Sequence, residues 1–234
     1  MSTFDIQNII TVEQPLFEPV TVAEAYEHLR WDTELEGSPP AEVYPLESLV
    51  ARNISTARAY VEQVTRRALV QQTCKLVLSS FPYTRRLFSS RWGGDEEWIT
   101  RPWMIELRRP PFQSLVSVQY LDKDEVLQTL APSNYYVDSE SSIVAQLWFR
   151  DTFDTDIVTD ERNDAVRITW VAGYTPEGSP PTTQEDYAAN IPRGIKDAIL
   201  LQTQLLSDRF DPKERADIER VRDHLLASYT IHTF

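Results

Sequence analysis

Apolar residues recur every three or four positions near both ends of the chain, which is the period of a helix, whereas in the middle they alternate as in strands. Thr21 and Glu24 have the spacing of a capping box, which predicts a short helix over about 21–30. A longer helix over about 45–67, opened by Pro45, follows from one apolar stripe. Its members are Leu46, Leu49, Val50, Ile54, Ala57, Val61 and Val64.

The middle of the chain is predicted to be mostly β. The segment 165–174 alternates most regularly, and it places Val166, Ile168, Trp170 and Ala172 on one face. A β-branched run predicts a strand within 68–81, and Gly93-Gly94-Asp95 indicates a turn at the tip of a long exposed excursion over 83–103. Further strands are predicted in 104–111, in a hairpin over 112–130 that turns at 122–125, and twice within 134–149.

Helix returns after a proline-containing linker loop over 175–192. The first predicted helix starts at Pro192, and the second covers about 213–229 after a break at Pro212. The first stripe is Ile195, Ala198, Ile199, Gln202, Leu205 and Leu206, and the second is Ile218, Val221, Leu225 and Tyr229. We therefore predict an α+β fold in which a helical domain is built from both chain ends, around an inserted antiparallel β section. The predicted parts are 1–68, 69–190 and 191–234.

The net charge of the chain argues against proteins that bind nucleic acid. The 234 residues carry a formal net charge of −13, and such a surface repels phosphate, so we expect no specific binding of nucleic acid. Residues 193–234 are neutral, with seven basic and seven acidic side chains, which predicts a second kind of surface there. The single cysteine, Cys74, predicts a buried thiol rather than a disulfide. No secretory signal and no run of about 18 apolar residues is present, so we expect no membrane role.

No motif for catalysis can be found. The histidines, at 28, 224 and 232, lack the spacing of a zinc site, and neither a nucleophile elbow nor a phosphate-binding glycine loop occurs. The acidic run over 151–164 lacks the residue order of a calcium loop and is interpreted as a solvated loop, with weak cation binding as the alternative. A metal-dependent hydrolase using Asp154, Asp156 and Asp160 is a less favoured hypothesis. We expect no catalytic residue, no metal and no cofactor.

The order of the segments resembles the head–tail connector (adaptor) family of long-tailed phages and gene transfer agents. The resemblance rests on PVTVAEAYEHLRWD, on the helix and strand LVARNISTARAYVEQVTRRALVQQTCKLVLSSFP, and on IELRRPPFQSLVSVQYLDKDEVLQTLAPSNYYVD. AVRITWVAGYTPEG and IPRGIKDAILLQTQLLSDR complete it, so that it covers about 19–225 with gaps. The excursion over 83–103 and the acidic stretch over 150–164 are longer than this family's pattern.

The resemblance implies a structural virion protein without catalysis, made in the host cytoplasm and located in the neck. Members form a ring, usually dodecameric, beneath the portal protein, and extend the DNA channel towards a stopper or tail protein. Genomic DNA passes through without specific binding. A stopper or tail-completion ring is the alternative within virion proteins.

Three sets of residues are candidates for contacts. The neutral C-terminal tail is the predicted portal contact, and it contains Tyr229, Ile231, His232 and Phe234. A ring or neighbour interface is predicted where aromatic and arginine side chains gather, although the tryptophans could equally pack onto their own β section. This set is Trp92, Trp98, Trp103, Arg108 and Arg109. Acidic candidates for the channel lining are Glu34, Glu36, Asp154 and Asp156.

Overall fold

The computed structural model describes residues 9–29, 44–81, 85–88, 97–100, 104–150, 162–207 and 210–231. It has the predicted α+β fold, since helices from both ends of the chain pack together and antiparallel strands lie between them in the sequence. The chain divides into two compact units. The helical unit is formed by residues 15–71 and 173–234, and the β unit by residues 1–14 and 72–172.

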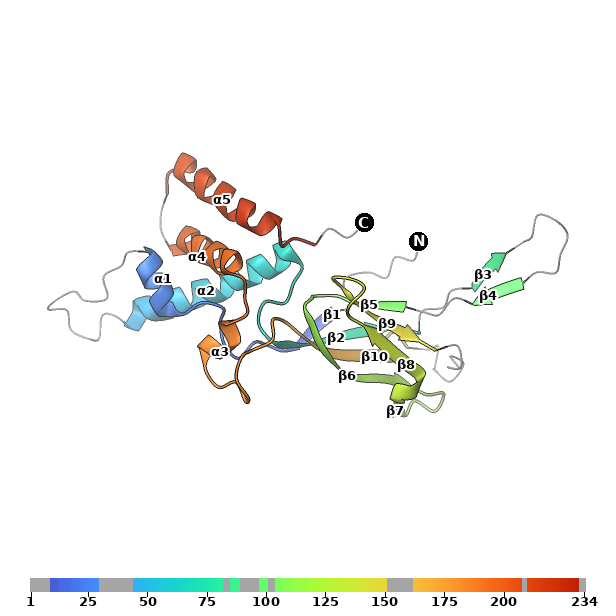
Figure 1. Cartoon of the computed structure of the whole chain (residues 1–234). Coiled ribbons are helices and arrows are strands. Elements are labelled where there is room, and N and C mark those ends of the chain that lie inside the picture. The colour runs from blue at the N-terminus through green and yellow to red at the C-terminus, as the bar shows by residue number, and fades with distance from the viewer. Residues whose placement is uncertain are drawn as a thin grey trace. The chain divides into compact units, whose positions relative to one another are not determined.

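The helical unit is organised around α4, which packs against both α2 and α5 (Figure 1). The predicted stripe of the long helix is confirmed at Val50, Ile54 and Val61, which are buried against Ile195 and Ile199 of α4. Burying each such side chain contributes about 1.5–3 kcal/mol. The helices are α1 (Val22–Leu29), α2 (Tyr44–Thr65), α3 (Gln184–Ala188), α4 (Arg193–Ser207) and α5 (Pro212–Ala227).

Side-chain caps fix where the shorter helices begin. The predicted capping box of α1 is confirmed, because the Thr21 amide donates to Glu24 Oε2 at 2.6 Å and the Glu24 amide donates to Thr21 Oγ1 at 3.1 Å. A second capping box, formed by Thr183 and Asp186, starts α3. The prediction of an unbroken linker loop over 175–192 was therefore wrong, because this box nucleates a short helix among the prolines.

The predicted apolar stripe of α5 was wrong at Val221, whose side chain is exposed. Arg222 and Leu226 are buried instead, whereas Leu225 and Tyr229 of the predicted stripe pack against the core in partly buried positions. The Arg222 guanidinium stacks over the Tyr60 ring at 4.6 Å and donates to Gln202 of α4. These contacts let a charged residue occupy the inner face of the helix.

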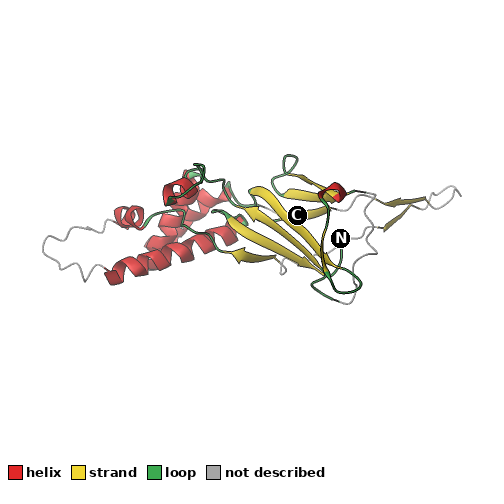
Figure 2. Ribbon diagram, turned by 90° about the horizontal axis from the view of Figure 1, so that it is seen from below, coloured by secondary structure: helices red, strands yellow, loops and turns green. Residues whose placement is uncertain are grey.

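The described strands of the β unit form three antiparallel sheets, and strands are drawn in yellow in Figure 2. The five-stranded sheet has the order β1-β2-β10-β6-β7, the three-stranded sheet has the order β5-β9-β8, and β3 and β4 form a two-stranded sheet. The strands are β1 (Ile9–Glu13), β2 (Gln72–Leu78), β3 (Arg85–Phe88), β4 (Glu97–Thr100), β5 (Met104–Leu107), β6 (Phe112–Leu121), β7 (Leu127–Thr129), β8 (Tyr135–Asp138), β9 (Ala145–Phe149) and β10 (Val166–Ala172).

The predicted alternation is confirmed in the central strand β10, where every second residue is buried and Trp170 is fully enclosed. The predicted hairpin is β6–β7, and the two strands expected within 134–149 are β8 and β9. Phe81, which follows β2, packs edge-on against Phe149 of β9 at 5.1 Å and against Tyr120 of β6 at 6.3 Å. These aromatic rings join the two larger sheets around one core.

The first strand, β1, was not expected. Its β-branched run Ile9-Ile10-Thr11-Val12 pairs with β2, more than 60 residues further along the chain. Residues 9–13 thus belong to the β unit, although the sequence assigned 1–68 to the helical part. Residues 173–190, assigned to the β section, belong to the helical unit. The chain therefore crosses between the units at points other than those indicated by its composition.

Candidate interaction surfaces

The C-terminal segment is bonded to the helical unit as far as Ile231. The Ile231 amide donates to the Thr65 carbonyl at 3.2 Å, and Arg67 Nε donates to the Tyr229 carbonyl at 2.8 Å. The Thr230 hydroxyl donates to the Leu226 carbonyl at 3.0 Å. Residues 229–231, the first part of the predicted portal contact, are therefore part of the fold of the helical unit. His232 and Phe234 lie outside the described residues.

Tyr229 also packs through its ring. A Cβ atom added to Gly194, in the first turn of α4, would lie 3.3 Å from the Tyr229 ring and from its hydroxyl oxygen, so glycine is what allows this close approach. Tyr174 lies near the same place, and its pKa is raised because burial disfavours the phenolate, an effect that Arg67 opposes. Tyr229 is therefore held among aromatic and arginine side chains of its own unit.

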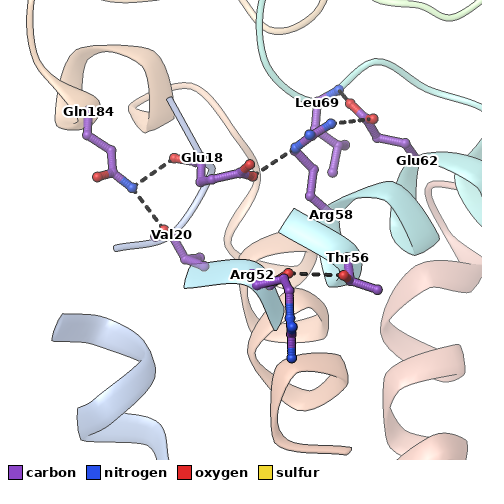
Figure 3. Close-up of polar contacts among 8 residues, drawn as sticks. All are labelled: Glu18, Val20, Arg52, Thr56, Arg58, Glu62, Leu69 and Gln184. Carbon is purple, nitrogen blue, oxygen red and sulfur yellow. Dashed lines mark hydrogen bonds and ion pairs between the residues drawn. The ribbon is translucent and has the colours of Figure 1, made fainter. Parts of the chain in front are cut away.

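A buried arginine ties together the segments that surround α2 (Figure 3). Arg58 Nε donates to Glu18 Oε2 at 2.8 Å, and a terminal nitrogen of the same guanidinium donates to Glu62 Oε2 at 2.9 Å. The other oxygen of Glu62 accepts the Leu69 amide at 3.0 Å. Since the Arg58 side chain is only 9% exposed, both of these charged hydrogen bonds are well shielded from water.

Gln184 of α3 extends this network. Its side-chain amide donates to the backbone carbonyls of Glu18 and Val20, at 3.0 and 2.9 Å (Figure 3). The segment that leads into α1 is thus held on one side by α2 and on the other by α3. On α2 itself, the Thr56 hydroxyl donates to the Arg52 backbone carbonyl, one helical turn earlier, at 3.0 Å.

The two arginines predicted at an interface have partners within the β unit. Arg108 forms an ion pair with Glu106 at 3.2 Å, in a partly exposed position. Arg109 has a φ of 68°, and its guanidinium donates to the Thr11 hydroxyl of β1 at 2.7 Å. Trp98 lies in strand β4, whereas Trp92 and Trp103 lie outside the described residues. Arg109 therefore has a bond that holds the turn before β6 to β1.

The acidic candidates, Glu34, Glu36, Asp154 and Asp156, all lie outside the described residues, as does Asp160. Asp164, at the end of the acidic run, accepts from Arg162 at 2.8 Å and from Arg167 at 2.9 Å. Hydrogen bonds from these two guanidinium groups lower its pKa to about 2. Within the described ranges, no group of three or more histidine, cysteine, aspartate or glutamate side chains could hold a metal ion.

Sequence reasoning missed a row of side chains on the outer face of the three-stranded sheet. The strand register places Met104 of β5 and Tyr136 of β8 on either side of Trp148 of β9. The rings of Tyr136 and Trp148 are stacked, with centroids 6.4 Å apart and planes 7° from parallel. The Arg150 guanidinium lies 5.8 Å from the centre of the Tyr136 ring. We call these four residues the aromatic strip.

The aromatic strip faces outward, since the alternate residues Ile105, Leu147 and Phe149 are the buried ones. Tyr136 is 46% exposed. The alternation within 135–138 and 145–149 could have indicated that Tyr136 and Trp148 point outward. That these side chains and Met104 lie side by side follows only from the register of the three strands. Tryptophan, tyrosine, methionine and arginine are also the residues enriched in protein interfaces.

No helix among the described residues is both long and apolar enough to cross a membrane.

Comparison with known proteins gives likeness in structure but not in sequence. No family model matches the chain, and no curated protein does. A chain in the neck of an empty gene transfer agent particle, solved with C6 symmetry, is similar over 97% of both chains, with a TM-score of 0.66 and 17% identity. A chain in the virion of a native gene transfer agent particle has a TM-score of 0.63 at 17% identity, again over 97% of both chains.

A third similar chain comes from the neck of a native gene transfer agent particle solved with C12 symmetry, with a TM-score of 0.55, 19% identity and 97% of each chain covered. At these identities the likeness concerns the fold. This chain thus shares, over nearly its whole length, the fold of chains found in gene transfer agent necks and virions.

Proposed function

We propose that this chain is a structural protein of the neck of a phage-like particle, where it acts as a head–tail connector adaptor. It forms a ring, dodecameric as in the family it resembles, beneath the portal protein and extends the DNA channel towards a stopper or tail protein. It is not an enzyme, and it needs no cofactor.

The observation that carries the proposal is the fold likeness to gene transfer agent neck chains over 97% of both chains. Because the likeness covers nearly the whole chain, it includes both units and the helices from both chain ends. It is therefore more than the sharing of one common domain. The order of sequence segments that resembles the connector family supports it independently.

Physical features of the chain agree with this role. A closed ring needs head-to-tail contacts between two different surfaces of each copy, and a helical unit and a β unit supply such surfaces. A net charge of −13 favours a channel in which DNA slides without sticking, because like charges repel. Glu34, Glu36, Asp154 and Asp156 are the proposed acidic lining.

The proposed portal contact is the C-terminal end, with Tyr229, Ile231, His232 and Phe234. Tyr229 and Ile231 are bonded to Arg67 and Thr65, so the residues that directly precede His232 are fixed on the helical unit. His232 and Phe234 are then the residues that reach the portal. The proposed ring or neighbour contacts are Trp92, Trp98 and Trp103, with Arg108 and Arg109.

The proposal is tested by mixing the purified chain with the portal oligomer of the same particle and following co-elution on a sizing column. Co-elution in the absence of any other neck protein supports an adaptor. Co-elution only after another neck protein has been added would assign the chain to the stopper or tail-completion class instead.

A further inference from the structure

Residues 229–231, which we call the C-terminal strap, are attached where α2 ends. The Ile231 amide donates to the carbonyl of Thr65, the last residue of α2, at 3.2 Å, and Arg67 Nε donates to the Tyr229 carbonyl at 2.8 Å. The Tyr229 side chain also packs against the core of the helical unit. The strap therefore holds both the last residue of α2 and the stretch that directly follows this helix.

The stretch that follows α2 leads from the helical unit into the β unit. The chain passes between the units after residues 14, 71 and 172. Residues 66–71 come directly before the second of these passages, and residues 173–174 come directly after the third. We call these two stretches the crossing segments, and both belong to the helical unit.

The two crossing segments are bonded to each other. The Tyr174 amide donates to the Leu69 carbonyl at 3.3 Å, and a Cβ atom added to Gly173 would lie 2.4 Å from the Val70 carbonyl oxygen, so the two backbones are in contact. The Leu69 amide donates in turn to Glu62 of α2 at 3.0 Å. Because of these contacts, one crossing segment cannot open without disturbing the other.

The strap lies near both crossing segments. Arg67, which is bonded to the strap, belongs to the first of them. Tyr174 belongs to the second, where burial raises the pKa of its phenol, Arg67 opposes this rise and Tyr229 adds to it. Charges act on one another over short distances in salt water, so these three side chains are neighbours. Tyr174 and Tyr229 also pack against the same core in partly buried positions.

We infer that the C-terminal strap couples binding at the end of the chain to the stability of the two crossing segments. The ends of a chain open more readily than the rest of a fold, and a partner that binds only the closed form makes opening rarer. A partner that holds residues 232–234 therefore keeps the strap on Thr65 and Arg67. The inference rests on the proposed function for the identity of that partner, the portal. It adds that portal binding stabilises two of the connections between the units, and that loosening them weakens portal binding in return.

Hydrogen exchange measured by mass spectrometry tests the role of the strap in two truncated chains that differ by one residue. The first ends at Ile231 and keeps the amide that donates to Thr65, whereas the second ends at Thr230 and lacks it. We expect peptides that cover the crossing segments to exchange about fivefold faster in the second chain, which is the effect of one hydrogen bond. Unchanged rates in these peptides would overturn the inference.

A peptide around Ile199 serves as the internal control in both truncated chains. Ile199 is fully buried in α4 and belongs to neither the strap nor the crossing segments, so its peptide should keep its exchange rate. Equal acceleration there would mean that the strap adds only to the overall stability of the chain, and the coupling would be wrong.

The full-length chain bound to its portal gives the second reading. Exchange in the crossing segments should be slower in the complex than in the free chain, and faster or unchanged exchange would contradict the coupling. The control is Ile231→Pro, which keeps residues 232–234 but removes the amide that donates to Thr65. Equal slowing in this variant would mean that the portal covers the crossing segments directly, which also overturns the inference. Failure of the chain to bind a portal would contradict the proposed function, while the two truncated chains would still test the strap.

Discussion

The amide of Ile231 donates a hydrogen bond to the carbonyl of Thr65, the last residue of α2, over 3.2 Å. The last four carbonyls of a helix have no partner within the helix, so an outside donor satisfies one of them here. Thr65 is fully buried, where an unmet carbonyl would be costly. Ile231 thus completes a helix that begins nearly 190 residues before it.

The bond from Ile231 to Thr65 divides the C-terminal residues into two parts. Residues 229–231 stabilise the fold, and we expect residues 232–234 to bind the portal. Deleting 232–234 should leave the melting temperature unchanged while weakening binding to the portal. Deleting 229–234 should lower the free energy of unfolding by about 3 kcal/mol, because the buried part of Tyr229 and the bond to Thr65 are both lost. Thermal unfolding and portal co-elution of the two truncated chains check this. Equal melting temperatures for both would contradict it.

Arg58 is the second position at which stability depends on one side chain. Replacing it by methionine keeps the stem but removes the guanidinium that pairs with Glu62, 14% exposed, and with Glu18, 29% exposed. Breaking a buried ion pair on one side costs about 3–5 kcal/mol, and the partial exposure of Glu18 reduces our expectation to about 2 kcal/mol.

Urea unfolding of Arg58→Met measures this. The matched control is Arg215→Met, which breaks the exposed pair with Glu219 on α5 and should cost under about 0.5 kcal/mol. Similar losses from both substitutions would show that the network around Arg58 adds nothing beyond a surface pair.

Gly173 is required by the backbone where β10 ends. Its φ is +117°, and a Cβ atom there would lie 2.4 Å from the Val70 carbonyl oxygen, which is backbone and cannot turn away. Gly173→Ala should therefore destabilise the chain by about 3 kcal/mol or more. Gly178 also has a positive φ, but its nearest neighbours would be 3.6 Å away, so Gly178→Ala should cost only about 1 kcal/mol. Chemical denaturation should rank the two variants in this order.

Acid should weaken the contact between Asp164 and its two arginines. Because the pKa of Asp164 falls from 3.8 to about 2 on folding, the unfolded chain takes up its proton first as the pH is lowered. The stability from this group is present above pH about 4 and is lost as the pH falls through about 2.

Melting temperatures of the unaltered chain and of Asp164→Asn, measured from pH 5 down to pH 2, test this. The variant should lose less on acidification than the unaltered chain. Some slope should remain, because hydrogen bonds also lower the pKa of Asp122, Asp138 and Asp186. Identical slopes for the two chains would contradict the assignment.

The helices and the central strand could be predicted because their patterns are local. The stripe of α2 and the alternation of β10 correctly named Val50, Ile54 and Trp170 as buried. Val221 was misplaced because the burial of Arg222 depends on Tyr60 and Gln202, which come from other helices. Strand β1 was missed because its partner is far away in the sequence.

The same limit applies to the candidate surfaces. The tryptophans near Gly93-Gly94 were predicted to form an interface because arginines and a turn lie beside them in the sequence. Trp148 has no such neighbours, because it lies in an ordinary alternating strand. Its alignment with Met104 and Tyr136 depends on the register of three strands, which the order of residues alone does not specify. A surface that depends on how strands are paired can therefore be identified only from the structure.

The central claim is that the chain is the adaptor beneath a portal. Light scattering of the complex purified on a sizing column tests it most directly, because the chain adds 27.1 kDa per copy. We predict an added mass close to twelve copies per portal oligomer, as the proposed dodecameric ring requires. A portal whose mass is unchanged at micromolar chain concentration would contradict the claim.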